Sequence, residues 1–216
     1  MGSTHQQPKT KPYFGYGSNL WLDQMRRRCP DSIFTGIGRL KGYTWFINSR
    51  GYANVAPVTS EEEKEEEEEE VWGLVYDLTP ADEAKLDVNE GVPEAYEKRM
   101  VGVEFWPCKP EEAEGEERGE GKVVEMLVYI DFKRNKPGFK PRDEYIVRMN
   151  HGIDDALEQG IPKSYVDRVL RGYIPEQFQT EEEEKKARDL AKKQAGRFVD
   201  ESGVVTPLAG SNSEDS

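Results

Sequence analysis

The sequence predicts an α+β fold in which a curled sheet or barrel is accompanied by helices. Three observations lead to this prediction. Short runs rich in β-branched and aromatic residues recur along the chain, helical patterns interrupt these runs without alternating regularly with them, and no internal repeat is visible. A doubly wound parallel sheet is disfavoured, because such a sheet requires regular alternation of strand and helix.

Six runs have the composition of β-strands, and one of them has the pattern of a central strand. Residues 71–78, VWGLVYDL, are apolar on both alternating faces, as expected of a strand that is buried on two sides. The six runs cover residues 13–16, 33–40, 43–47, 71–78, 96–106 and 123–130.

A short helix is predicted directly after the run at 71–78. Thr79 is a suitable N-cap residue, Pro80 stands at the first helical position, and Asp82 adds an acid at the third. The helix should extend to about Asp87. Glu90 therefore follows shortly after the predicted end of this helix.

Further helices are predicted on both sides of this segment. Residues 21–28 follow a small polar turn that opens a helix. Apolar residues recur at spacings of three and four between 146 and 156, so they share one helical face, and Gly160 supplies a stop. Another helix should follow Pro162.

The 216 residues fit one compact domain with appendages, since a typical domain holds roughly 100 to 150 residues. We expect a disordered N-terminus over 1–11, a domain over 12–177 and a charged, largely disordered tail over 178–216. The Glu-rich run at 60–70 should be a solvated low-complexity insertion, because like charges repel and cannot pack. Within the tail, Thr180 with Glu183 suits the cap of one exposed helix, whereas 201–216 should be disordered.

Charge and hydropathy exclude two classes of partner. A formal net charge of −13 disfavours binding to a nucleic-acid backbone, and the basic stretch at 26–28 is too short to change that. No run of about 18 apolar residues exists, so no membrane span is predicted. The polar N-terminus lacks the apolar stretch of a signal peptide, which favours a cytoplasmic location.

Few residues suit metal, cofactor or thiol chemistry. Cys29 and Cys108 lack neighbours at metal-binding spacing, and free thiols are expected. A Ser-His or Cys-His dyad would depend entirely on His151. The chain also lacks the complete glycine fingerprint of a dinucleotide site and the lysine motif of a phosphate loop. We therefore predict no metal and no cofactor.

The segment at 13–20 is a hydrophobic strand that enters a small polar turn before a helix. Its glycines permit close backbone approach, and the amides at the start of a helix can bind an anion such as a carboxylate. A tight strand-to-helix connection capped by a polar side chain explains the same pattern. The candidate binding residues are Tyr13, Phe14, Gly15, Tyr16, Gly17, Ser18, Asn19 and Leu20.

Glu90 follows the capped helix and precedes Gly91, which permits an unusual backbone conformation beside a carboxylate. Glu90 can therefore point into a cavity. An exposed acid in an acid-rich chain is the alternative interpretation, because glutamates are rarely buried.

Three motifs occur in an order and spacing that resemble the γ-glutamylcyclotransferase family: YGSNL at 16–20, VWGLVYDL at 71–78 and LDVNEGV at 86–92. The resemblance covers about 13–174 and implies a small mixed β-barrel with flanking helices. It further implies a substrate pocket lined by 13–20 and a catalytic glutamate at Glu90. Tyr145 resembles a family tyrosine that faces the substrate, although an aromatic residue packed on the barrel at a helix start explains it equally well.

The implied reaction closes a γ-glutamyl group into 5-oxo-L-proline and releases the attached amino acid or amine, without a cofactor. Glu90 would act as general base and acid, and backbone amides of residues 17–20 would hold substrate oxygens. The partner is thus a small γ-glutamyl compound. γ-Glutamylamine and glutathione types of cyclotransferase remain alternatives, as does a catalytically silent fold used as an acidic binding module. The sequence leaves the oligomeric state open, a homodimer included.

Overall fold

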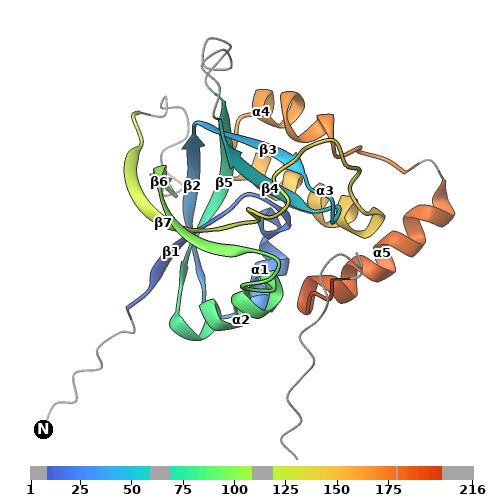
Figure 1. Cartoon of the computed structure of the whole chain (residues 1–216), viewed down its shortest axis with the longest axis horizontal. Helices are drawn as coiled ribbons and strands as arrows, with labels where there is room; N and C mark the ends of the chain where they lie inside the picture. Colours follow the sequence, from blue (N-terminus) through green and yellow to red (C-terminus); the bar gives the residue numbers. More distant parts are fainter. Residues whose placement is uncertain (1–8, 59–68, 109–118, 179, 201–216) are drawn as a thin grey trace, which may run out of the picture.

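Five strands close into a mixed barrel in the computed structural model, which describes residues 9–58, 69–108, 119–178 and 180–200. Around the barrel the strand order is β1-β5-β2-β6-β7, with β1 and β7 parallel and the other neighbours antiparallel. Figure 1 shows this barrel. The strands are β1 (Lys11–Gly15), β2 (Ile33–Lys41), β5 (Glu70–Leu78), β6 (Glu97–Pro107) and β7 (Lys122–Ile130).

A two-stranded sheet stands beside the barrel and holds a loop that reaches the pocket described below. The strands β3 (Tyr43–Ile47) and β4 (Ala53–Pro57) pair antiparallel. Between them, the side-chain oxygen of Asn48 accepts from the amide of Arg50 at 3.0 Å, and the amide of Gly51 donates to the carbonyl of Asn48 at 2.9 Å. These bonds fix the turn that places Arg50 and Tyr52.

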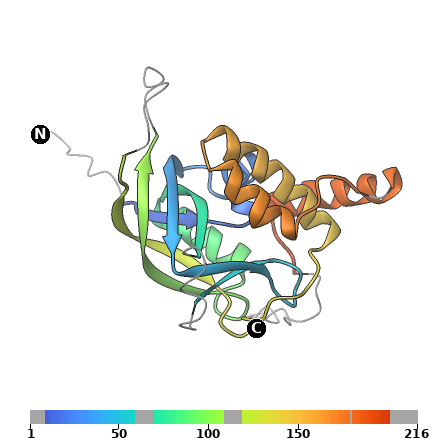
Figure 2. The same ribbon diagram turned by 90° about the horizontal axis from the view of Figure 1, so that it is seen from above.

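The helices gather at one end and one side of the barrel. Figures 1 and 2 show α3, α4 and α5 on the same side, and α3 packs against both α5 and the 3₁₀ turn η1. The helices are α1 (Leu22–Arg28), α2 (Pro80–Glu90), α3 (Asp143–Glu158), α4 (Lys163–Arg168) and α5 (Glu181–Gly196), with the 3₁₀ turns η1 (Ser18–Leu20) and η3 (Leu170–Gly172). No helix in the described ranges is long and apolar enough to cross a membrane.

The structure confirms the six predicted strands and the predicted barrel. β5 lies between β1 and β2, as its two apolar faces indicated. The structure adds β4, a short strand that the sequence analysis missed. Helix α2 begins as predicted, with the Thr79 side chain accepting from the amide of Asp82 at 3.2 Å. It runs past Asp87 to Glu90, where Gly91 ends it in the left-handed conformation at φ 63°.

Two predictions about acidic segments need correction. Residues 59–68 of the predicted insertion lie outside the described residues, but Glu70 is the first residue of β5 and pairs with Arg39 at 3.2 Å. The helix predicted at the Thr180 cap is confirmed as α5, but it is not the exposed helix of a tail, because it buries four side chains, Ala187, Ala191, Gln194 and Ala195. Small residues recurring every fourth position let this otherwise charged helix pack closely. Residues 1–8 and 201–216 lie outside the described residues.

Candidate active site

A pocket opens where the end of the barrel meets α2, α3 and the segment after α5. It contains about 470 Å³ of space not filled by protein atoms, part of which is open to solvent, and its walls combine aromatic rings with three arginines and one glutamate. Such a mixture suits a small ligand with charged groups. The lining residues are Tyr13, Tyr16, Gly17, Ser18, Asn19, Arg28, Arg50, Tyr52, Ala53, Asn89, Glu90, Tyr96, Tyr129, Tyr145, Arg148 and Phe198.

Most of the predicted site residues meet in this pocket, and three do not. Phe14, Gly15 and Leu20 are buried in the protein interior and are not among the lining residues. Phe14 follows Tyr13 on β1, so its ring points to the opposite face of the strand. Leu20 packs where α3 has a glycine, since a methyl group on Gly152 would lie 2.9 Å from the Leu20 side chain. These three residues serve packing.

Glu90 ends helix α2, and its carboxylate accepts a hydrogen bond from Asn19 Nδ2 at 3.0 Å. The same amide nitrogen donates to the hydroxyl of Tyr13 at 2.8 Å. The Asn19 oxygen accepts from Gln24 Nε2 at 2.9 Å and from Arg28 Nη1 at 3.2 Å, which fixes the orientation of the amide. The turn at 16–20 and helix α2 therefore act together to aim one carboxylate at the pocket.

The environment of Glu90 raises the pKa of its carboxyl group. Burial is the largest cause, and it outweighs the stabilising effect of Arg28, Asn19, Arg50 and Arg148 on the charged form. The negative end of the α2 dipole, where Glu90 lies, also disfavours a carboxylate. A carboxyl group with a raised pKa can both take up and return a proton near neutral pH.

The raised pKa of Glu90 has a consequence for stability. Between the ordinary pKa and the raised one, the folded protein binds more protons than the unfolded chain, so this group's contribution to stability falls as pH rises. We expect Glu90→Gln to gain stability relative to the native protein on going from about pH 4 to about pH 8. Urea unfolding of both proteins at the two pH values measures this, and an unchanged difference between them would contradict it.

Tyr145 lies in the first turn of α3, and its hydroxyl links the turn η1 to the start of β4. The hydroxyl oxygen accepts from the amides of Ser18 and Ala53, both at 3.2 Å. The amide of Leu20 is also occupied, since it donates to the carbonyl of Gly17 at 2.9 Å. Two of the amides that the sequence suggested for substrate binding are thus used within the protein. With both lone pairs engaged, the phenol hydrogen of Tyr145 remains able to donate to a ligand.

Tyr145→Phe should destabilise the protein by about 1 to 3 kcal/mol, because two buried amides lose their acceptor. Chemical denaturation measures this loss. Tyr43→Phe is the matched control, because Tyr43 is only partly buried at the start of β3. Equal stability of the Tyr145 and Tyr43 variants would show that the two amide bonds contribute little.

Three arginines of the pocket were missed by the sequence analysis. Arg28 belonged to a short basic stretch, and Arg148 has the only readable signal, a Glu144–Arg148 spacing of four on an apolar helix face. Arg50 lies in a turn, and no sequence pattern around it indicates a role. Phe198 was missed because it lies in the segment predicted as tail.

Arg28 ties helix α5 to the site. Its Nη2 donates to the carbonyl of Gln194 at 2.8 Å and its Nε to that of Ala195 at 3.3 Å, at the negative end of the α5 dipole. Burial and the nearby charge of Arg148 lower the pKa of Arg28 to about 10, so it stays charged at neutral pH. The helix that the sequence placed in a tail therefore supports the pocket.

Among the residues that the structure describes, no thiol or imidazole group lines this pocket. Burial raises the pKa of the Cys29 thiol to about 12, which makes it a poor nucleophile. His151 stacks on Trp21, with ring centroids 4.6 Å apart, and neither lines the pocket. Among the described residues, no group of three His, Cys, Asp or Glu side chains is placed to hold a metal ion.

Comparison with known proteins agrees with the fold and with the motifs. The family model described as "Gamma-glutamyl cyclotransferase, AIG2-like" matches residues 13–144, which include the turn at 16–20 and Glu90. The chain belongs to this family. A mouse protein named "Gamma-glutamylcyclotransferase" is 23% identical over 184 residues, covering 82% of this chain and 86% of the mouse protein. A human protein of the same name is 25% identical over 164 residues, covering 73% and 76%.

Solved structures share the architecture. One named "Gamma-glutamyl cyclotransferase" has a TM-score of 0.59 at 23% identity, covering 84% of this chain and 99% of that chain. A human protein solved as uncharacterized has a TM-score of 0.58 at 25% identity, covering 83% and 98%. The barrel and its flanking helices are therefore the fold of this family.

Proposed function

We propose that this protein is a γ-glutamylcyclotransferase that converts a γ-L-glutamyl amino acid into 5-oxo-L-proline and the free amino acid. The observation that carries the proposal is Glu90, whose carboxyl group lines the pocket with a raised pKa and is held by Asn19. Membership of the family supports the reaction class. The reaction needs only proton transfer and correct folding of the substrate, so the proposal includes no cofactor.

Glu90 acts first as a base and then as an acid. The α-ammonium group of the substrate gives a proton to Glu90, and the resulting amine attacks the γ-carbonyl carbon of the same molecule. The tetrahedral intermediate collapses as the bond to the departing nitrogen breaks and that nitrogen receives the proton from Glu90. The ring nitrogen loses its remaining extra proton, which the released amine takes up to become an ammonium group. Because nucleophile and carbonyl belong to one chain, holding the substrate bent supplies a high effective concentration.

Tyr145 and the turn at 16–20 shape the substrate for this attack. In this proposal the phenol hydrogen of Tyr145 donates to an oxygen that gains negative charge in the intermediate, which is supported by the position of Tyr145 in the pocket wall. Gly17 lets the Tyr145 hydroxyl approach the turn, since a methyl group at Gly17 would lie 2.8 Å from that oxygen. The turn therefore contributes backbone shape, with Asn19 positioning the carboxylate of Glu90.

The leaving group separates the proposed activity from its alternatives. A γ-glutamylamine enzyme would release an amine without a carboxylate, and a glutathione enzyme would release a dipeptide. The buried arginines of the pocket favour a substrate that carries more negative charge than a γ-glutamylamine.

Release of 5-oxoproline from a panel of substrates tests the proposal. The panel contains γ-glutamyl amino acids, γ-glutamylamines and glutathione, each at the same concentration. Fastest release from γ-glutamyl amino acids supports the proposed function. Preference for γ-glutamylamines or glutathione would replace it with the corresponding alternative, and no release from any member would favour the acidic binding module.

A further inference from the structure

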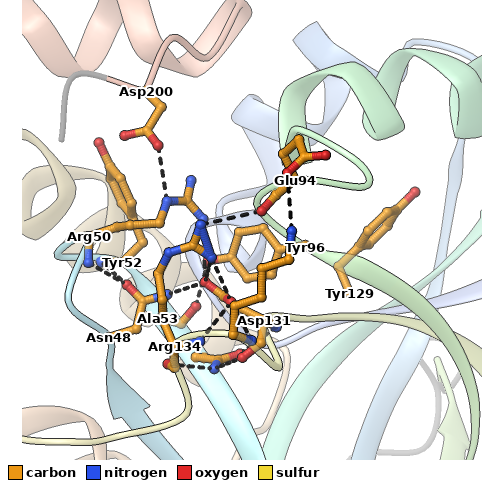
Figure 3. Close-up of polar contacts among 12 residues, drawn as sticks. Asn48, Arg50, Tyr52, Ala53, Glu94, Tyr96, Tyr129, Asp131, Arg134 and Asp200 are labelled. Atoms are coloured by element: carbon orange, nitrogen blue, oxygen red, sulfur yellow. Dashed lines mark hydrogen bonds and ion pairs between the residues drawn. The ribbon is translucent and has the colours of Figure 1, made fainter. Parts of the chain in front are cut away.

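Arg50 occupies an unusual place in the wall of the pocket. It lies in the turn between β3 and β4 and is 2% exposed. Its guanidinium group packs over two aromatic rings, 5.3 Å from the centroid of Tyr52 and 5.0 Å from that of Tyr96. Figure 3 shows Arg50 with Asp200 on one side and Asp131 on the other. Its Nε donates to Asp200 Oδ2 at 3.0 Å.

One donor of Arg50 is left without an acceptor. Within the described residues, Nη1 has no hydrogen-bond partner, and the Oδ2 atom of Asp131 lies 3.9 Å from it, beyond hydrogen-bond distance. Asp131 is engaged elsewhere, because Arg134 Nη1 donates to both of its oxygens at 2.9 and 3.0 Å. The Tyr52 hydroxyl, also in the pocket wall, likewise lacks a partner in the described part of the chain. Buried donors without acceptors are costly, so a ligand that supplies an acceptor is favoured here.

The other two arginines of the pocket differ from Arg50. Arg148 uses Nε and Nη2 on Glu144 and Nη1 on Ser18 Oγ. Arg28 uses its three nitrogens on Asn19 and on two carbonyls of α5. Arg50 is therefore the pocket guanidinium with a buried nitrogen still to be paired, as far as the described residues show.

The chain after α5 presents a carboxylate to Arg50. The amide of Phe198 donates to Asn89 Oδ1 at 2.9 Å, directly beside Glu90, and its ring contacts Tyr52 edge to face with centroids 5.1 Å apart. Two residues further along the chain, the Asp200 side chain pairs with Arg50 and is only 12% exposed. An internal carboxylate thus occupies one side of a guanidinium that lines the pocket.

We propose that Arg50 recognises a carboxylate of the substrate, and that Asp200 holds this position in the empty pocket until the ligand carboxylate takes its place. The inference deepens the proposed function and rests on it. A γ-glutamyl amino acid carries two carboxylates, one on the glutamyl unit and one on the leaving group. Either carboxylate can bind a guanidinium group in the same way, so the experiment uses probes that each lack one of the two carboxylates.

Isothermal titration calorimetry with three probes tests the proposal, with all variants built on Glu90→Gln to suppress turnover. The first probe is γ-glutamyl-L-alanine. The second is γ-glutamylethylamide, which lacks the leaving-group carboxylate, and the third is 4-aminobutanoyl-L-alanine, which lacks the glutamyl α-carboxylate. Arg50→Gln should raise the Kd of γ-glutamyl-L-alanine on the order of 10- to 100-fold, because a charge-assisted bond is lost. It should leave the probe that lacks the recognised carboxylate nearly unaffected.

Asp200→Asn should change the Kd in the opposite direction to Arg50→Gln. With the competing carboxylate removed, the Kd of γ-glutamyl-L-alanine should fall by about 3- to 10-fold. A purely structural Arg50–Asp200 pair would instead weaken binding in both variants, and this outcome would overturn the proposal. Equal losses of all three probes in Arg50→Gln would overturn it as well.

Two further variants serve as controls that separate an effect on binding from a general loss of structure. Arg50→Lys keeps the charge and should show a smaller loss with the same preference among probes. Arg99→Gln removes an exposed arginine that pairs with Glu97 at 2.7 Å outside the pocket lining, and it should leave every Kd within about twofold. Selective binding without 5-oxoproline release by the native protein would overturn the proposed function and leave this inference standing. Absence of binding by all three probes would overturn both.

Discussion

Glu90→Gln is expected to lower kcat/KM for 5-oxoproline release by about 10²- to 10⁴-fold, the usual contribution of a positioned acid or base. Glutamine has nearly the same shape, and its oxygen can still accept from Asn19 as the carboxylate does. It cannot take the proton from the substrate ammonium group or return it to the leaving nitrogen. In the native protein, kcat/KM should rise with pH through the raised pKa of Glu90, because the base must be deprotonated.

Glu94→Gln is the matched control for this experiment. Glu94 lies four residues further on, is exposed and pairs with Lys133 at 3.1 Å. Its loss should leave kcat/KM within about twofold, since exposed pairs contribute little. If Glu90→Gln retained native activity with an unchanged circular dichroism spectrum, Glu90 would have no part in the reaction, and another group would have to move the proton.

The parts of the fold that depend on local pattern could be predicted from the sequence. The run at 71–78 is apolar on both faces because β5 lies between two strands, and Thr79 begins α2 because its hydroxyl satisfies a free amide. The position of Glu90 also follows from local signals. A capped helix and Gly91 fix where the chain turns, and family motifs then single out one acid among many.

The rest of the site depends on contacts between distant segments. Asn19 and Glu90 meet although 71 residues separate them, and Arg50 meets Asp200 across 150 residues. A helix capped at Thr180 was predicted, but as an exposed one, because its surface charges dominate its composition while the alanines that pack α5 are few. The Tyr145 hydroxyl changed the interpretation of the turn at 16–20, since it occupies an amide that the sequence alone left open for substrate.

Glu144→Gln should cost about 3 to 5 kcal/mol of stability, the penalty for leaving a buried charge without its partner. Glu144 and Arg148 are 3% and 1% exposed, and two hydrogen bonds of 2.7 and 3.1 Å join them one turn apart on α3. Nη1 of the same guanidinium holds the Ser18 hydroxyl at 2.9 Å. Loss of Glu144 should therefore also loosen the turn that carries Asn19, so activity should fall together with stability.

Urea unfolding of the native protein, Glu144→Gln and Glu182→Gln compares the loss of a buried ion pair with the loss of an exposed one. The comparison shows how much of the destabilisation comes from burial. Glu182 pairs with Lys186 at the same helical spacing, at 2.7 Å, but both side chains are exposed, and its loss should change stability little. A double variant, Glu144→Leu with Arg148→Met, should recover part of the loss, because no unpaired charge is then buried. If the double variant were less stable than Glu144→Gln, the guanidinium contacts of Arg148 with the turn would outweigh the cost of its buried charge. Glu144 would then serve mainly to orient Arg148 toward Ser18.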